Sequence, residues 1–283
     1  MTKGDNVSNT LIKFGVDGLT IESNRLDEYI NYINENSVKS IFIYYMQYDL
    51  TNVSFLTECP TLESITINAP INDFKGLYEM ANLKELILSH DLADSINFSR
   101  LSMLKLLILS LKQNPQKLSY LTNLERLVIL DYKPKSRNLK DLPLFRNLTE
   151  IELVKSNITS INGIEKFENL SKIEFHYLSK LEDIKNIHTF SNKLKELRME
   201  NCKRIIFEDY LSCLKELEAL ALVKCGNLSS IKFIRNMNKL RDFIFPGTDV
   251  LDGDVSPCFG LEYVHFTNKK HFNHKENEFN NTF

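Results

Sequence analysis

Residues 147–163, NLTEIELVKSNITSING, carry apolar side chains at offsets that fit neither a helix nor a single strand. Counted from Leu148, the apolar positions are 1, 4, 6, 11 and 14, occupied by Leu148, Ile151, Leu153, Ile158 and Ile161. Positions 4 and 6 follow the two-residue period of a strand, whereas positions 11 and 14 lie beyond it. A chain that buries all five must therefore turn back after each short strand.

The L-x-x-I-x-L unit of this stretch recurs along most of the chain, with starts 20 to 24 residues apart. A fixed period of this length is typical of repeat architectures. Within each unit, positions 4 and 6 point to one side and positions 3, 5 and 7 to the other. One copy cannot bury its apolar side alone, whereas parallel stacking buries a continuous core. The eleven copies begin at Val38, Leu62, Leu83, Leu104, Leu124, Leu148, Leu170, Leu194, Leu217, Leu240 and Leu261.

These copies resemble leucine-rich repeats, and NLTEIELVKSNITSINGIEKFENL is similar to the roughly 22-residue class of bacterial internalin-like proteins. The resemblance implies an α/β fold, a leucine-rich repeat solenoid or horseshoe. A parallel β-sheet would line its concave face, with short helices and turns on the convex face. The resemblance also implies that the concave face binds proteins. Position 9 is usually Asn or Cys in the family. Here Cys202 and Cys225 fit in two copies, whereas other copies hold residues such as Met46 or Pro70, so we expect irregular turns.

The chain is expected to form three segments. Residues 1–37 would be an N-terminal cap, a strand followed by an amphipathic helix for which Asn24 is a candidate N-cap. Residues 38–266 would form the repeat domain of about 11 repeats, and residues 267–283 a polar C-terminal tail. Caps are needed because the end faces of a solenoid otherwise leave apolar surface bare.

Composition favours a soluble protein of the cytoplasm. The 283 residues are 43% hydrophobic and 25% charged, with a net charge of -2 and no long block of Lys and Arg, so neither nucleic acid nor a membrane is an expected partner. No apolar run approaches the roughly 18 residues that cross a bilayer. The first residues lack the apolar segment of a secretory signal. Five scattered cysteines indicate reduced thiols.

Sequence motifs give no support for an enzyme. The nine glycines form no nucleotide-binding loop, and no G-x-S-x-G or H-E-x-x-H motif occurs. Cys202 and Cys225 lie one repeat apart and could hold a metal or form a redox pair, but two buried donors in the turns are favoured. His265, His271 and His274 match no compact metal site, and a solvated tail is favoured. We therefore predict no catalytic residue, no metal site and no cofactor.

The middle copies place charged side chains at positions 3, 5 and 7. Glu152 and Glu174, with His176 nearby, could form an acid/base pair or a metal site. Lys172 and Arg198 stand beside them, however, and signs alternate along position 3. Such alternation favours cross-strand ion pairs on an exposed sheet, about 4.8 Å between neighbours. These pairs would shape a surface for electrostatic selection of a partner.

The N-terminal copies place apolar side chains at the same outward positions. We expect a contiguous exposed apolar patch, which usually marks an interface. Alternatively, the cap or a loop covers this patch, or the sheet curls enough to shield it. The apolar residues are Phe42, Tyr44, Ile87, Leu106, Ile108, Val128 and Leu130.

Together these patterns predict a non-enzymatic protein–protein interaction module that binds a protein partner on its concave face. A more specific version, implied by the resemblance, is a bacterial immunity protein that neutralises a toxin. The alternatives are an enzyme or metal-binding protein using the acidic and His residues, and an internalin-like surface protein. The candidate partner-binding residues are Phe42, Tyr44, Ile87, Leu106, Ile108, Val128, Leu130, Glu150, Glu152, Glu174, His176, Arg198 and Glu200.

Overall fold

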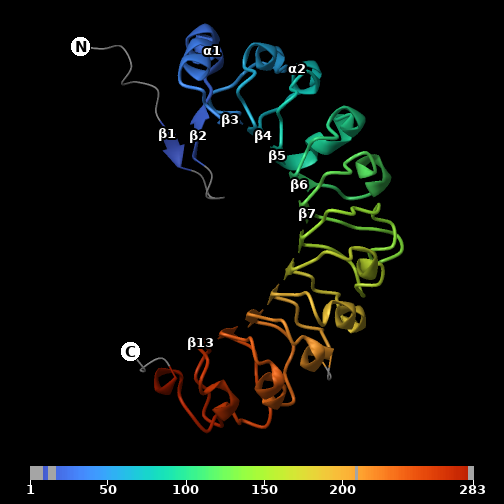
Figure 1. The fold of residues 1–283 in the computed structure, drawn as a ribbon, viewed down its shortest axis with the longest axis vertical. Coiled ribbons are helices and arrows are strands. Elements are labelled where there is room, and N and C mark those ends of the chain that lie inside the picture. The colour runs from blue at the N-terminus through green and yellow to red at the C-terminus, as the bar shows by residue number, and fades with distance from the viewer. Residues whose placement is uncertain (1–8, 12–16, 208–209, 280–283) are drawn as a thin grey trace, which may run out of the picture. The chain divides into compact units, whose positions relative to one another are not determined.

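The structure is a computed structural model that describes residues 9–11, 17–207 and 210–279. It divides into two compact units, unit 1 (Met1–Leu111 with Lys117–Arg126) and unit 2 (Lys112–Gln116 with Leu127–Phe283). Within each unit the strands follow one another in chain order (Figure 1). The strands are β1 (Asn9–Leu11), β2 (Asp17–Thr20), β3 (Ser40–Tyr44), β4 (Ser64–Asn68), β5 (Glu85–Leu88), β6 (Leu106–Ser110), β7 (Arg126–Leu130), β8 (Glu150–Val154), β9 (Lys172–His176), β10 (Glu196–Glu200), β11 (Ala219–Val223), β12 (Asp242–Ile244) and β13 (Tyr263–His265).

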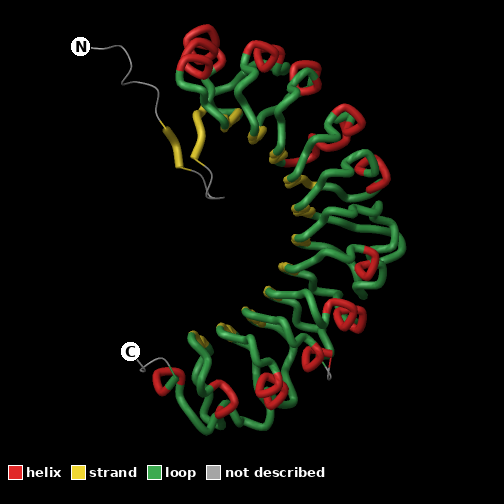
Figure 2. The backbone as a smooth tube through the Cα atoms, viewed as in Figure 1, coloured by secondary structure: helices red, strands yellow, loops and turns green. Residues whose placement is uncertain are grey.

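Helices are short and lie between the strands. Loops separate the helices from the strands (Figure 2), and among the described residues no helix lies between β7 and β8. The α-helices are α1 (Leu26–Glu35) and α2 (Lys75–Tyr78). The 3-10 helices are Ser23–Arg25, Ser54–Glu58, His90–Ser95, Phe98–Arg100, Pro115–Leu118, Ile164–Lys166, Lys185–Phe190, Tyr210–Cys213, Lys232–Asn236, Ser256–Cys258 and Glu276–Glu278.

Each of the eleven predicted copies contains one strand, β3 to β13. In the copy quoted above, β8 carries positions 4 and 6, and the segment after it turns back to carry positions 11 and 14. All five apolar side chains of that copy, Leu148, Ile151, Leu153, Ile158 and Ile161, are at most 1% exposed. Stacked copies thus join their apolar sides into the core that the spacing predicts.

In unit 1, β1 pairs antiparallel with β2, and β2 to β6 pair in parallel. Helix α1 begins at Leu26, and its N-cap is Arg25, which makes no side-chain capping bond. The expectation that Asn24 caps this helix is therefore wrong. The reason is local: Ser23–Arg25 forms a 3-10 turn directly before α1, so Asn24 lies inside that turn, one residue before the cap.

In unit 2, β8 to β13 pair in parallel, residue against residue. The turns after β7 to β12 use a left-handed residue at position 8, with φ between 50° and 73°. This conformation reverses the chain and directs position 9 back into the core. The left-handed residues at position 8 are Asp131, Lys155, Tyr177, Asn201, Lys224 and Gly247.

Two cysteines at position 9 act as buried donors in the turns of unit 2. Cys202 Sγ donates to the carbonyl of Phe175 at 3.5 Å, and Cys225 Sγ donates to that of Met199 at 3.3 Å. In each case the acceptor is position 6 of the preceding copy. The thiols therefore link successive copies, which is the role that sequence favoured over a metal or redox pair.

A second set of links was not predicted from the sequence. Asn82 donates its side-chain amide to the carbonyl of Pro60 at 3.0 Å, Asn123 to that of Ser102 at 3.0 Å and Asn169 to that of Arg146 at 2.8 Å. Each Asn stands directly before the first leucine of its copy. The bond satisfies a carbonyl of the preceding copy. It also holds the segments that lead into successive strands in register.

Aromatic side chains cover the last strand of unit 2. Within the segment predicted as a polar tail, Phe272 packs at 5.7 Å from the ring of Phe266, and Phe279 packs at 5.8 Å from it. Phe266 also stacks on Phe245 at 4.9 Å. These rings shield the apolar end of the stack. No helix in the described residues is long and apolar enough to span a membrane.

Candidate interaction surface and carboxylate–imidazole cluster

The outward face of unit 1, made of positions 3, 5 and 7 of its strands, is more closed than the sequence suggests. Phe42 is 1% exposed, Ile87 5% and Ile108 7%. Val128, which belongs to unit 2, is also buried, at 4%. The expectation that these four side chains are exposed is therefore wrong. Tyr44, Leu106 and Leu130 are half-buried.

Neighbouring side chains of the same row explain this burial. Phe42 stands in register between Thr20 and Thr66, both of which are buried themselves. Its ring lies 6.2 Å from that of Tyr44, and a Cβ added at Gly18 would clash with the ring. The ring is thus held between the backbone of β2 and its own strand. Small residues on both sides let it lie flat.

Large apolar side chains are nevertheless exposed at the turn that follows β3. Tyr45 is 64% exposed and Met46 is 76% exposed. Neither side chain belongs to the predicted apolar patch, although both directly follow Tyr44 in the chain.

The outward face of β8, β9 and β10 in unit 2 is charged. Of its nine outward side chains, eight are titratable and the ninth is Val154. The in-register pairing aligns Glu152 with Glu174 and Glu174 with Arg198. The eight titratable residues are Glu150, Glu152, Lys172, Glu174, His176, Glu196, Arg198 and Glu200.

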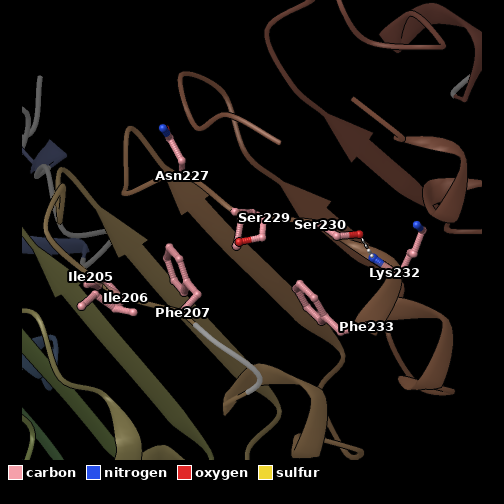
Figure 3. Close-up of a pocket in the computed structure, with 9 residues that line it drawn as sticks. Ile205, Ile206, Phe207, Asn227, Ser229, Ser230, Lys232 and Phe233 are labelled. Carbon is pink, nitrogen blue, oxygen red and sulfur yellow. Dashed lines mark hydrogen bonds between the residues drawn. The ribbon is translucent and has the colours of Figure 1, made fainter. Parts of the chain in front are cut away.

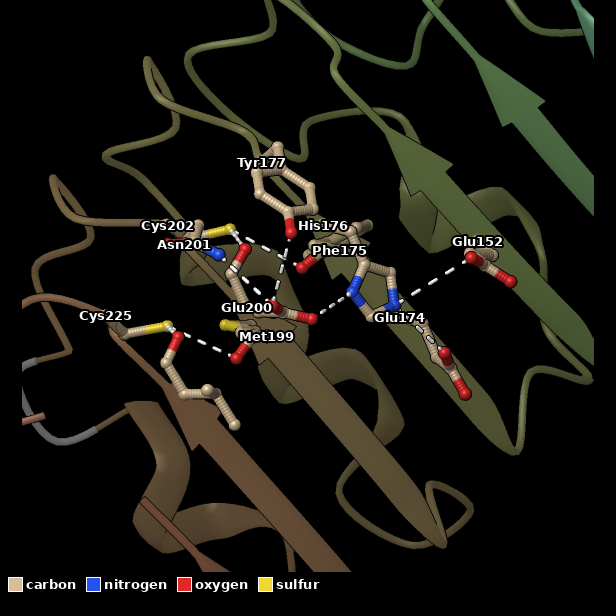
Figure 4. A network of polar contacts seen from close by, with 11 residues as sticks. Glu152, Glu174, Phe175, His176, Tyr177, Met199, Glu200, Asn201, Cys202 and Cys225 are labelled. Carbon is tan, nitrogen blue, oxygen red and sulfur yellow. Dashed lines mark hydrogen bonds and ion pairs between the residues drawn. The ribbon is translucent and has the colours of Figure 1, made fainter. Parts of the chain in front are cut away.

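Four of these residues form a compact group, here called the carboxylate–imidazole cluster: Glu152, Glu174, His176 and Glu200 (Figure 4). His176 Nε2 lies 3.0 Å from Glu174 Oε2 and 3.8 Å from Glu152 Oε1. His176 Nδ1 lies 3.3 Å from Glu200 Oε2. Figure 4 shows the imidazole between Glu200 on one side and the other two carboxylates on the opposite side.

Two turn residues hold Glu200 in place. Asn201 Nδ2 donates to Glu200 Oε1 at 3.1 Å, and the Tyr177 hydroxyl donates to the same oxygen at 3.4 Å. Both are left-handed residues at position 8 of their copies. The turn conformation therefore orients the carboxylate that in turn orients the imidazole.

The electrostatics of the cluster favour its charged forms. The hydrogen bond from His176, followed by that from Lys172, lowers the pKa of the Glu174 carboxyl to about 2, against the opposing effect of burial. The hydrogen bond to Glu174 raises the pKa of His176, and the charges of Glu152 and Glu174 act in the same direction. The imidazolium is thus stabilised among three carboxylates.

Ion pairs cross the same face, as the alternating charges predict. Lys172 Nζ lies 3.0 Å from Glu174 and 3.0 Å from Glu196 on the next strand. Glu196 and Arg198 are exposed. Each such surface pair is worth less than about 1 kcal/mol, so their arrangement matters more for selecting a partner than for stability.

The C-terminal histidines each pair with a different carboxylate. His265 Nδ1 lies 2.6 Å from Glu276, His271 Nε2 lies 3.1 Å from Asp249, and His274 Nδ1 lies 3.0 Å from Glu278. These are separate pairs.

A depression of about 470 Å³ lies in the segments that follow β10 and β11 (Figure 3). Apolar side chains and two serines line it, and Lys232 is its titratable group. The Lys232 backbone N–H donates to Ser230 Oγ at 3.2 Å. This lining contains no acid/base pair. The residues are Ile205, Ile206, Phe207, Asn227, Leu228, Ser229, Ser230, Lys232 and Phe233.

No protein-family model matches the sequence, and no curated protein matches it either. Solved structures do match. An internalin from Listeria monocytogenes has a TM-score of 0.54 at 15% identity, covering 90% of this chain and 83% of that chain. A leucine-rich repeat protein of Leptospira interrogans has a TM-score of 0.53 at 16% identity, covering 83% of this chain and 56% of that chain.

A chain of the Toll–Spatzle complex of Drosophila has a TM-score of 0.57 at 11% identity, covering 89% of this chain and 37% of that chain. The chain thus spans just over half of the Leptospira protein and about a third of the chain from the Toll complex. At such identities the likeness concerns the fold alone. The buried repeat positions, the parallel strands within each unit and these matches together identify the fold as the leucine-rich repeat fold, as predicted.

Proposed function

We propose that this protein is a non-enzymatic interaction module that binds a protein partner on the outward face of its strands. The observation that carries the proposal is the face of β8 to β10, where eight of nine outward side chains are titratable. Charged side chains in fixed register discriminate between partners, because a like charge placed opposite them is costly. Glu196 and Arg198 are the most exposed side chains of this face.

The Toll–Spatzle complex, a structural neighbour, supports a protein as the partner, since the fold there takes part in a protein complex. A net charge of -2 disfavours nucleic acid. Our more specific proposal is a cytoplasmic bacterial immunity protein that neutralises a toxin. An adjacent gene for a toxin-like protein would support this version, and rescue of growth on co-expression with that gene would test it.

Affinity capture from the native lysate, followed by mass spectrometry, tests the binding proposal. The face variant combines Glu196→Lys with Arg198→Glu. Its matched control combines Glu168→Lys with Lys180→Glu, which exchanges the same charges at exposed positions outside the strands. We expect the wild type and the control to capture the same protein and the face variant to lose it. Equal capture by all three would contradict binding on this face.

A further inference from the structure

The carboxylate–imidazole cluster brings metal-ligand atoms together. Among the described residues, one group of three or more His, Cys, Asp or Glu side chains has ligand atoms that converge: Glu152, Glu174 and His176, within 4.8 Å of one another. Glu174 and His176 project from the same side of β9, and Glu152 pairs in register with Glu174 from β8. Strands hold these donors more rigidly than loops would.

The chemistry of these donors selects a class of ion. Imidazole and carboxylate together suit zinc and its neighbours among the first-row transition metals, whereas magnesium and calcium prefer oxygen donors alone. His176 Nε2 lies 3.0 Å and 3.8 Å from the two carboxylate oxygens. Two donors at about 2.1 Å from a tetrahedral zinc ion are roughly 3.4 Å apart, which falls between these distances.

The imidazole is also oriented in the way that metal sites require. A histidine that binds a metal almost always donates its other ring N–H to a carboxylate or carbonyl. His176 Nδ1 faces Glu200, and Glu200 is itself fixed by Asn201 and Tyr177. Once Nε2 gives up its hydrogen, the Nδ1–H···Glu200 contact holds the ring so that the Nε2 lone pair faces Glu152 and Glu174. This oriented imidazole distinguishes the cluster from a row of acidic side chains.

We propose that Glu152, Glu174 and His176 bind one divalent transition-metal ion of the Zn²⁺ type, with Glu200 as a positioning residue. The ion coordinates His176 Nε2 and one oxygen of each glutamate. It replaces the hydrogen that Nε2 shares with Glu174, and that proton passes to solvent. Three protein donors leave a coordination position open toward the outward face, where water or a side chain of a partner can occupy it. The site does not depend on the protein-binding proposal.

Isothermal titration calorimetry of the full chain with ZnCl₂ tests this site. We expect one equivalent to bind to the wild type and to be lost in Glu152→Gln, Glu174→Gln and His176→Gln. Glu200→Gln should keep the equivalent but weaken it by about 10- to 100-fold, because it removes an orienting partner only. Circular dichroism of each variant distinguishes a lost site from a lost fold.

Two control variants make the result specific. Glu196→Gln changes a carboxylate on the same face outside the group, and His265→Gln changes a histidine paired with a single carboxylate, Glu276. Both should bind Zn²⁺ as the wild type does. Unchanged zinc binding in folded His176→Gln would overturn the proposal, and so would Mg²⁺ or Ca²⁺ binding as tightly as Zn²⁺. Loss of the equivalent in Cys225→Ser would place the ion at the thiols and also overturn it.

Discussion

The outward face of β3 to β5 in unit 1 and that of β8 to β10 in unit 2 follow the same alternation but differ in access to water. In unit 1 the position-5 side chains of these strands, Phe42, Thr66 and Ile87, are small or apolar, and all three are buried. In unit 2 the row is long and charged, and the members of the carboxylate–imidazole cluster are only half-buried. Apolar side chains that pack against small neighbours are shielded from water, whereas long charged side chains keep their charged ends in contact with water. Strand alternation therefore fixes the direction of a side chain and leaves its exposure to its neighbours.

Ile108→Glu should have the largest effect, because it places a charge on the closed outward face of unit 1, in β6. The side chain is 7% exposed, so the variant would bury an unpaired carboxylate, and we expect the free energy of unfolding to fall by about 3 kcal/mol or more. Urea unfolding measures it. The charge substitutions at Leu106 and Ile108 that the sequence alone would suggest as a binding test would thus damage the fold. A loss below about 0.5 kcal/mol would mean that this row is open to solvent.

Gly18→Ala tests how tightly the closed row is packed. A Cβ at this position would clash with the ring of Phe42 and lie 2.9 Å from Ser40 Oγ. We expect a loss of about 1–3 kcal/mol, the usual range for overpacking a core. Thermal unfolding followed by circular dichroism measures it. In the double variant with Phe42→Leu, part of the loss should be recovered, and strict additivity would argue against contact between the two residues.

The carboxylate–imidazole cluster predicts a pH profile for stability. His176 has a folded pKa above its ordinary 6.5, so its contribution is complete below about pH 6.5 and is lost as pH rises through the folded value. Glu174 has a folded pKa of about 2 against an ordinary 4.5, so its contribution is present above pH 4.5 and is lost as pH falls toward 2. The groups facing His176 are Glu152, Glu174 and Glu200.

Urea unfolding between pH 5 and 9 measures the alkaline limb of this profile, and NMR titration of the imidazole locates the pKa of His176. His176→Gln should flatten the limb, whereas His188→Gln, at an exposed histidine in the 3-10 helix Lys185–Phe190, should leave it unchanged. An imidazole that titrates below 6.5 in the folded protein would contradict the arrangement.

Arg198→Glu should have the smallest effect on stability. The side chain is exposed on the charged face, and surface substitutions usually change the free energy of unfolding by less than about 0.5 kcal/mol. Urea unfolding checks this value. The same variant should impair partner capture if that face is the binding surface, so the two readouts separate stability from recognition. A large destabilisation would show that Arg198 supports the fold instead.

The fold could be predicted because the repeat places the same demand on every copy. Positions 4 and 6 must be buried in each strand, so eleven imperfect copies reinforce one interpretation. The Asn links were missed although the sequence carries their signal, an Asn directly before Leu83, Leu124, Leu148 and Leu170. Their meaning depends on which carbonyl of the preceding copy lies within reach, and spacing alone does not give that.

The candidate site was only partly accessible from the sequence. The in-register strands bring Glu152, Glu174 and His176 together as the rows of the repeat suggest. The support of Glu200 by Tyr177 and Asn201 could not be foreseen, because it depends on the left-handed conformation of two turn residues. Neither residue type requires that conformation, so the sequence carries no clear signal for it.

The buried thiols give the molecule its own reporters of local opening. Cys59 in unit 1 and Cys258 in unit 2 are fully buried, and burial raises their pKa to about 11 and about 12. Only the thiolate reacts with an alkylating reagent, so modification has to wait until the surrounding copy opens. The labelling rate of each cysteine therefore measures how often its own unit opens locally. Comparing the two rates would reveal whether the units open together or independently, without introducing any probe.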